Sequence, residues 1–298
     1  MTVSSIPDPS DASPNATPGR GSREGFWVSS PREGDLIAGR FELLSLIGEG
    51  GMGMVWLAKD LRLQRLVAIK LLKPAVILDR HARLRFLEEA RIAAKLRHPH
   101  IVTIHDVGHK VPYIVQEYVE GEDLRKVLKR HPGGLPVPLF LKFATHIADG
   151  LVAAHHEKIV HRDIKPANVL VDAHDHAKVG DFGLSVVIDP TGGPQYAWIG
   201  TLHYLPPEQV QERPDARSDC YSLGCLYYEM ATGRPPFSGS TPEAIIGGHK
   251  HGFPAPLTDY RSDLPVAVNQ LIVELLGKRL DERPTAESVR SRLSALGS

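Results

Sequence analysis

The stretch KIVHRDIKPANVL, residues 158–170, holds polar side chains of the kinds that carry out catalysis, set between two apolar runs. Within eight positions it contains His161, Arg162, Asp163, Lys165 and Asn168. A short polar stretch fixed by rigid strands on either side is the usual way in which a protein holds catalytic groups in place. The pattern therefore favours a catalytic loop, provided that the rest of the chain supplies those strands.

A second candidate for chemistry is the glycine-rich segment IGEGGMGMV, in which Gly48, Gly50 and Gly53 have GxGxxG spacing and Val55 follows. Such glycines let backbone N–H groups approach phosphates, although many turns also contain three glycines. A dinucleotide-binding fold would begin a helix after the last glycine. Here MVWLAKD continues with β-branched and aromatic residues, so the segment predicts a β-hairpin.

The elements around these segments change in character along the chain. FELLSLIGEGGMGMVWLAKD, LVAIKLLK and YIVQEYV read as strands of a sheet-rich first lobe. One helix interrupts it, HARLRFLEEARIAAKLRHP, and its spacing puts Glu89 on the apolar face with Phe86, Ala93 and Leu96. A buried carboxylate without a partner is costly, so we expect a basic partner for Glu89 from the sheet.

The second half of the chain reads as helical, and the N-terminus as a tail. Helical spacing joins the apolar residues Phe140, Phe143, Ala144, Ile147, Leu151 and Ala154. DCYSLGCLYYEMATG is apolar on most faces, which predicts a buried helix that ends at Gly233. Residues 1–34 are rich in Ser, Pro, Gly and Asp, so we expect a disordered tail.

Composition limits the classes of function. The 298 residues suffice for two domains or for one domain of two lobes. Lys and Arg total 35, as do Asp and Glu, so no overall field indicates a nucleic-acid or membrane partner. The sequence shows no signal peptide and no run of about 18 apolar residues, so we expect no membrane span in this chain.

Two groups of residues invite a metal or disulfide interpretation. Cys220 and Cys225 are the only cysteines and lie five positions apart, which favours reduced core residues in a cytoplasmic protein over a disulfide or metal site. The second group consists of four histidines: His155 and His156 at a helix end, and His174 and His176 in the turn DAHDHAK. With no cysteine or third ligand nearby, they do not favour a metal site.

Taken in order, five segments resemble the signature of the protein kinases. They are VAIK ending at Lys70, the inward-facing Glu89, HRDIKPAN, DFG from Asp181 to Gly183, and PPE from Pro206 to Glu208. More narrowly, HRDIKPANVLV, GTLHYLPPEQ and DARSDCYSLGCLYYEMATGRPPF resemble the eukaryotic-type Ser/Thr kinases of bacteria. The resemblance implies an α+β bilobal protein-kinase fold over residues 35–296, with an N-lobe of about 35–119 and a C-lobe of about 120–296.

The resemblance also implies roles for the polar residues. Asp163 would take the proton of the substrate hydroxyl, and Lys165 would offset charge near the transferred phosphate. Lys70 would bind the α- and β-phosphates of ATP and pair with Glu89. Asn168 and Asp181 would supply oxygen ligands to Mg²⁺. The residues expected to contact the nucleotide are Ile47, Gly48, Gly50, Gly53, Val55, Ala68, Lys70, Glu117, Val119 and Leu170.

For other residues, the resemblance implies a place in the structure and not a part in the chemical step. Val55, Ala68 and Leu170 would sandwich the adenine, and the backbone of Glu117 and Val119 would bond its edge, next to Gln116 as gatekeeper. Glu208 is expected to pair with Arg283, Asp219 to brace the catalytic loop, and Phe182 to pack beneath the docked helix. Thr201 would bond to Asp163 and Lys165, and Thr191 is the expected autophosphorylation site.

The expected function is that of an ATP- and Mg²⁺-dependent kinase acting on Ser and Thr residues of protein substrates. A nucleotide-binding pseudokinase scaffold is the main alternative, although such proteins usually lack one of the residues that Lys70, Asp163 and Asp181 represent here. A small-molecule phosphotransferase is a third interpretation, against which the PPE segment argues. The sequence does not indicate the protein substrate, the upstream signal or the oligomeric state.

Overall fold

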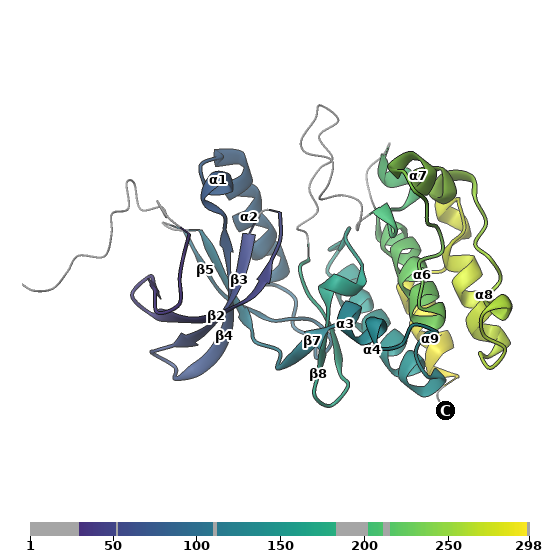
Figure 1. Ribbon diagram of the computed structural model, residues 1–298, viewed down its shortest axis with the longest axis horizontal. Helices are drawn as coiled ribbons and strands as arrows, with labels where there is room; N and C mark the ends of the chain where they lie inside the picture. Colours follow the sequence, from purple (N-terminus) through teal and green to yellow (C-terminus); the bar gives the residue numbers. More distant parts are fainter. Residues whose placement is uncertain (1–29, 52, 110–111, 183–201, 211–214, 297–298) are drawn as a thin grey trace, which may run out of the picture.

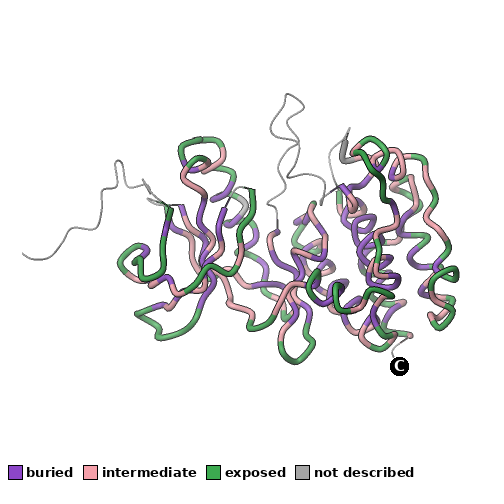
Figure 2. The backbone as a smooth tube through the Cα atoms, in the orientation of Figure 1, coloured by how far each residue is buried: buried purple, intermediate pink, exposed green. Residues whose placement is uncertain are grey.

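The chain folds into two lobes, one rich in strands and one mainly helical, with the second, smaller sheet near their boundary (Figure 1). The computed structural model describes residues 30–51, 53–109, 112–182, 202–210 and 215–296. Figure 2 shows that buried backbone runs through the centre of both lobes. The α+β bilobal fold expected from the sequence is confirmed.

The N-lobe contains a six-stranded sheet in the order β1-β2-β3-β4-β6-β5, in which all neighbours are antiparallel. Its strands are β1 (Leu36–Ile37), β2 (Phe41–Glu49), β3 (Gly53–Asp60), β4 (Arg65–Leu72), β5 (Ile104–Gly108) and β6 (Tyr113–Glu117). The described helices of this lobe are α1 (Pro74–Ile77) and α2 (Arg80–Ala93). α2 packs on the sheet because Phe86, Leu87 and Ala90 share a buried cluster with Ile114 of β6.

The register of β3 and β4 decides which side chains face the inside of the molecule. Successive side chains of a strand point to opposite faces of the sheet. Trp56 and Ile69 are cross-strand partners and lie in a buried cluster on one face. Val55 and Lys70 are the next pair along, so both belong to the opposite face. The alternation therefore brings Lys70 to the same face as one of the residues expected to contact adenine.

The glycine-rich hairpin between β2 and β3 is confirmed, and its glycines have different structural reasons. Gly48 pairs with Val55, and the Gly50 N–H donates to the Gly53 oxygen at 2.9 Å. A Cβ added at Gly53 would lie 2.6 Å from the Leu71 oxygen, so close approach of the strands requires glycine there. A Cβ at Gly50 would meet no atom within 4 Å, so packing does not explain that glycine.

The C-lobe is built from helices, with a second, small sheet on the side that faces the N-lobe (Figure 1). Its described helices are α3 (Leu124–Lys129), α4 (Val137–His156), α6 (Ala216–Thr232), α7 (Pro242–His251), α8 (Val266–Leu275) and α9 (Ala286–Ser294). Short 3-10 turns are η1 (Pro166–Asn168), η3 (Pro207–Val210), η4 (Leu257–Asp259) and η5 (Leu280–Glu282). The small antiparallel sheet consists of β7 (Gly121–Asp123), β8 (Val169–Asp172) and β9 (Ala177–Val179).

The buried helix predicted around the two cysteines is α6. Nearly all of its residues are buried, Asp215 caps its N-terminus, and Gly233 ends it in the left-handed conformation with φ 75°. Cys220 and Cys225 are buried free thiols, as expected, and burial raises the pKa of the Cys220 thiol to about 12. Such thiols are protonated at neutral pH and act as small core residues.

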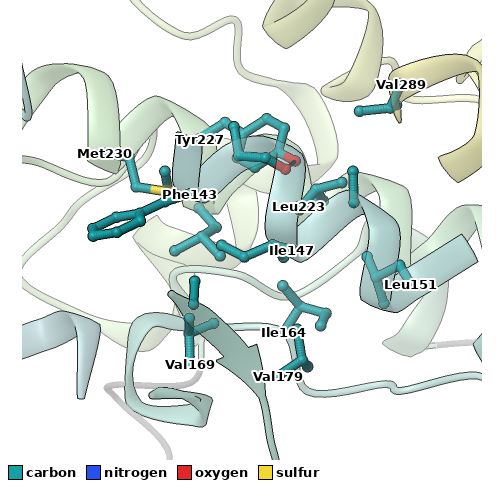
Figure 3. Close-up of a cluster of buried hydrophobic side chains, with 14 of the residues drawn as sticks. Phe143, Ile147, Leu151, Ile164, Val169, Val179, Leu223, Tyr227, Met230 and Val289 are labelled. Carbon is teal, nitrogen blue, oxygen red and sulfur yellow. Dashed lines mark hydrogen bonds between the residues drawn. The ribbon is translucent and has the colours of Figure 1, made fainter. Parts of the chain in front are cut away.

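One helix of the described part, α4, is long and apolar enough to cross a membrane by length and composition alone. Its side chains Phe143, Ile147 and Leu151 are fully buried in the C-lobe core, beside Leu223 and Tyr227 of α6 (Figure 3). Within this fold, the apolar character of α4 is therefore accounted for by packing. The same core includes Ile164, Val169 and Val179, so it supports the polar loop of residues 158–170 from beneath.

Candidate active site

The loop predicted to be catalytic is anchored to α6 by one buried carboxylate. Asp219 accepts hydrogen bonds from the backbone N–H groups of His161 at 2.8 Å and Arg162 at 2.7 Å. His155 Nε2 lies 2.8 Å from the Asp219 Oδ2, and Asp219 is only 1% exposed. Arg162 has φ 70°, which is uncommon for a residue with a side chain and is maintained only when its surroundings fix it. The expected bracing role of Asp219 is confirmed.

His161 links this loop to the segment at Asp181. Its ring is fully buried, and Nε2 lies 2.9 Å from the Gly180 oxygen, so Nε2 carries the proton. Nδ1 accepts from the Asp163 N–H at 3.2 Å, which fits the same tautomer. The His161 ring also packs against Phe182, with 4.5 Å between ring centroids. Phe182 is buried and lines a small cavity together with Ala90 and Ala93 of the α2 region, so its expected place beneath that helix is confirmed.

Asp163 is held by two neighbours from its own loop. Its Oδ2 lies 2.7 Å from Lys165 Nζ and accepts from Asn168 Nδ2 at 2.9 Å. Asn168 Nδ2 also donates to the Asp163 backbone oxygen at 2.8 Å. Because both contacts use the amide nitrogen of Asn168, its amide oxygen is the atom left for a metal ion. The structure thus brings together three residues that the sequence analysis singled out.

Lys70 of β4 meets Asp181, which lies 111 residues further along the chain, with Nζ 2.8 Å from Oδ1. Burial alone would raise the pKa of Asp181, but Lys70, with smaller contributions from His161 and Lys165, holds the pKa below its ordinary value. Asp181 has φ 57°, so, like Arg162, it is a non-glycine residue with a left-handed backbone conformation. Glu89 lies within α2, but its side chain is outside the described residues, so its pairing with Lys70 stays a prediction.

The groups expected to hold Mg²⁺ fit that ion in chemistry and position. Asn168 and Asp181 supply an amide oxygen and a carboxylate, the hard ligands that Mg²⁺ prefers. The N–H of Gly180, which precedes Asp181, donates to the Asn168 backbone oxygen at 2.8 Å. This bond keeps Asn168 and Asp181 close to each other. Among the described residues, no group of three or more His, Cys, Asp or Glu could hold a metal by itself. A metal here would therefore need phosphate or water oxygens to complete its shell.

The residues expected around adenine lie at the junction of the lobes. Ala68 of β4 pairs with Gln116 of β6, and Ala68 is buried, whereas Leu170 of β8 is half-buried. Ile47 is 45% exposed, which is high for a large apolar side chain. Gln116 lines a cavity of about 20 Å³ together with residues that include Lys70, Asp181 and Phe182. Apolar side chains that are partly open to solvent, such as Leu170 and Ile47, are suited to cover a flat ring.

The histidines that invited a metal interpretation, and the residues after Asp181, can also be compared with the expectations from the sequence. His155 bonds to Asp219, and His176 Nδ1 lies 3.1 Å from Asp172 Oδ2, so both have protein partners within the described residues. The expected pair of Glu208 and Arg283 is confirmed, with two bonds of 2.7 and 2.9 Å. Thr191 and Thr201, with residues 183–201 as a whole, lie outside the described residues.

Besides the contact of Lys70 with Asp181, two further interactions near the site were not predicted from the sequence. One is the bond of His155 to Asp219, and the other is an ion pair between Glu117 and Lys178 with 2.6 Å between Oε1 and Nζ. The partners are 64 and 61 residues apart, and no local pattern connects them. The one local signal was the position of Glu117 in the hinge, the segment from Glu117 to Val119 that follows β6 and leads into the C-lobe, and it indicated a role for the backbone of Glu117 and not for its carboxylate.

A strand-rich lobe with α2 on its sheet, a helical lobe and a polar loop between them define the bilobal kinase fold. The family model for the protein kinase domain matches residues 41–292, and the chain belongs to this family. It is 39% identical over 269 residues to the serine/threonine-protein kinase PknB of Mycolicibacterium smegmatis, covering 86% of this chain and 43% of the relative. The Mycobacterium tuberculosis protein of the same name is 40% identical over 272 residues, with the same coverage.

A solved structure gives the same fold. The crystal structure of the Mycobacterium tuberculosis PknI kinase domain has a TM-score of 0.69 and 28% sequence identity, covering 90% of this chain and 98% of that domain. The chain spans less than half the length of the PknB relatives, 43% in both cases. The family and the fold are therefore shown over the region that corresponds to a kinase domain.

Proposed function

We propose that this chain transfers the γ-phosphoryl group of ATP to Ser and Thr hydroxyls of proteins, with Mg²⁺ as the metal cofactor. The observation that carries the proposal is the Asp163 carboxylate, held by Lys165 and Asn168 at 2.7 and 2.9 Å in a loop anchored by a buried aspartate. Two relatives whose names state serine/threonine-protein kinase support the same acceptor class.

In the proposed reaction, the substrate hydroxyl oxygen forms a bond to the γ-phosphorus while the bond from that phosphorus to the β-bridging oxygen breaks. ADP leaves with the electron pair of the broken bond, and the hydroxyl proton passes to the Asp163 carboxylate. Lys165 lies beside that carboxylate and would offset negative charge near the transferred group. Asp163 therefore acts as the base, and Lys165 as an electrostatic stabiliser.

The nucleotide and metal residues follow from the same site. Lys70 would bind the α- and β-phosphates, and its 2.8 Å contact with Asp181 keeps the phosphate and metal positions adjacent. Asn168 and Asp181 would hold Mg²⁺, which when bound neutralises charge on the phosphate oxygens. Val55, Ala68 and Leu170 would enclose adenine, with the backbone of Glu117 and Val119 at its edge.

We also propose a domain division and a location. Residues 35–296 would form the kinase domain and residues 1–34 a tail, in a protein that works in the cytoplasm in signalling. Buried free thiols at Cys220 and Cys225 support a reducing compartment. The kinase would phosphorylate itself, with Thr191 as the proposed site.

The test is incubation of the purified chain with Mg–ATP and a mixed Ser, Thr and Tyr peptide library, followed by phosphosite mapping of peptides and protein. We expect phosphate on Ser and Thr, on Thr191 of the chain itself, and no transfer in EDTA. Transfer mainly to Tyr would contradict the acceptor class. ADP binding without any transfer would support the pseudokinase scaffold instead.

A further inference from the structure

The carboxylate of Glu117 lies at the end of β6, where the chain leaves the N-lobe, and the proposed function gives it no task. One oxygen, Oε1, lies 2.6 Å from Lys178 Nζ. The other, Oε2, accepts from the Thr103 backbone N–H at 3.2 Å. The side chains of Lys178 and Glu117 are 18% and 27% exposed, so the pair is largely shielded from solvent. Both oxygens of this carboxylate thus tie it to other segments.

Thr103 and Glu117 bond to each other twice, in opposite directions. The Glu117 backbone N–H donates to the Thr103 oxygen at 2.8 Å, and the Glu117 carboxylate accepts from the Thr103 N–H. The neighbouring Val102 N–H donates to the Val179 oxygen of β9 at 2.9 Å. The segment before β5 is therefore fixed both to the end of β6 and to the C-lobe sheet.

Lys178 carries the other half of the contact into the C-lobe. It is the central residue of β9, and its antiparallel partner on β8 is Leu170, the residue proposed to lie against adenine. Three positions after Lys178 comes Asp181, which contacts Lys70 and is proposed to bind the metal. The ion pair thus links the hinge at Glu117 to β9, whose neighbouring strand carries Leu170 and whose following residues lead to Asp181.

We propose that Glu117 and Lys178 form a positioning pair that fixes the hinge backbone for nucleotide binding. The proposal rests on the proposed function for the identity of the nucleotide, and both residues act through others instead of touching the reacting atoms. A charge-assisted hydrogen bond in a shielded place holds its partners more firmly than a neutral one. Loss of the charge would leave the fold in place but let the hinge and β8 shift relative to each other.

The chain offers a near-isosteric test of this role. Glu117→Gln keeps an oxygen for the Thr103 N–H and removes the charge that Lys178 meets. Lys178→Met keeps an unbranched side chain of similar length and removes the same interaction from the other side. If the pair acts as a unit, the two single variants and the double variant should have equal effects, because the second change has nothing further to remove.

The experiment uses the full chain, with Glu117→Gln, Lys178→Met and the double variant. KM for ATP and kcat are measured with a saturating peptide, Kd for ADP by calorimetry, and the melting temperature by scanning calorimetry. We expect KM for ATP and Kd for ADP to rise about fivefold in each variant, with kcat within about twofold. The control is Lys142→Met, a lysine whose Nζ donates to the His174 oxygen at 2.9 Å away from the hinge, and it should change none of these.

The outcomes separate positioning from simple stabilisation. An unchanged Kd for ADP with a lowered melting temperature would overturn the proposal, because the pair would then serve the fold alone. Additive effects in the double variant would also overturn it. If the wild type binds ADP but transfers no phosphate, the proposed function fails while the effect of the pair on ADP affinity is still measured.

Discussion

The ion pair of Arg283 and Glu208 inside the C-lobe and the ion pair of Lys70 and Asp181 in the candidate active site differ in how much of their hydrogen-bonding capacity is used. Arg283 is fully buried and makes two bonds to Glu208, and its guanidinium also donates to the backbone oxygens of Gly277, Arg217 and Lys278. Within the described residues, Lys70 meets Asp181 through one bond between Nζ and Oδ1. The Lys70 and Asp181 side chains are 15% and 34% exposed.

The difference follows from what each pair must do. A buried charge is tolerated when its hydrogen-bonding capacity is filled, and Arg283 meets that condition. A group that must bind phosphate or metal has to keep part of its capacity for the ligand. Among the described residues, therefore, the saturated ion pair is the structural one, and the partly coordinated pair is the one that we propose to bind phosphate and metal.

The largest effect should come from breaking the saturated pair. In Arg283→Met, Glu208 would remain in a shielded place without its cation, and the free energy of unfolding should fall by about 3–5 kcal/mol. Urea denaturation followed by circular dichroism measures this. The matched control is Arg292→Met, since Arg292 also makes two bonds to a carboxylate, Glu274, at 2.6 and 3.0 Å, but on the surface. That change should cost about 1 kcal/mol or less, and equal losses in both variants would contradict the distinction.

In the active site the expected effect falls on turnover and leaves stability nearly unchanged. Asp163→Asn keeps the shape of the side chain and removes the proton acceptor, so kcat should fall by about 100-fold or more. ADP affinity by calorimetry and the melting temperature should stay close to those of the wild type. Equal turnover in the two proteins would rule out Asp163 as the base, and a large fall in melting temperature would place it with the structural pairs.

The partly buried histidine pair His100 and His146 should make the stability of the protein depend on pH. The His100 and His146 rings stack at 3.9 Å, and both bond to the backbone of Ala177. Burial lowers the pKa of His146 from 6.5 to about 4, so the unfolded chain binds more protons between these values. Stability should therefore be full above about pH 6.5 and be lost as the pH falls toward 4, by about 1–2 kcal/mol after screening by solvent.

The measurement is the melting temperature between pH 7 and 5. His146→Asn keeps an acceptor for the Ala177 N–H and removes the titrating ring, so its melting temperature should depend less on pH. The exposed His156 gives the control, because His156→Asn should leave the slope as in the wild type. An unchanged slope in His146→Asn would show that acid acts elsewhere.

The smallest effect is expected at the N-terminus. The composition of the tail argues against packing, so removal of residues 1–29 should leave kcat/KM within about threefold. Removal of residues 1–34 also deletes the Gly34 N–H that donates to the Leu43 oxygen at 2.8 Å, and should lower stability by about 1 kcal/mol. A collapse of kcat/KM in the shorter deletion would show that the tail contributes to the site.

Local patterns in the sequence were sufficient for many elements. Period-2 and period-3.6 patterns predicted the β2–β3 hairpin, α2 and α6, and Gly233 predicted the end of α6. They did not predict β5, where the polar residues His105 and Asp106 interrupt the alternation, or the short strand β7. Of the strands expected on either side of the catalytic loop, β8 follows the loop, but α4 precedes it, so that half of the expectation was wrong. Short strands carry little pattern of their own, since their pairing comes from neighbours distant in sequence.

From the sequence, the resemblance of its motifs to those of the protein kinases indicated which groups are expected to carry chemistry: Lys70, Asp163, Lys165, Asn168 and Asp181. Only the tertiary structure decided what those groups meet. That Lys70 lies 2.8 Å from Asp181, and that the Glu117 carboxylate meets Lys178, depends on segments 111 and 61 residues apart. The physical reason is that strand register and helix periodicity act over a few residues, whereas a charge finds its partner only after the two lobes have packed together.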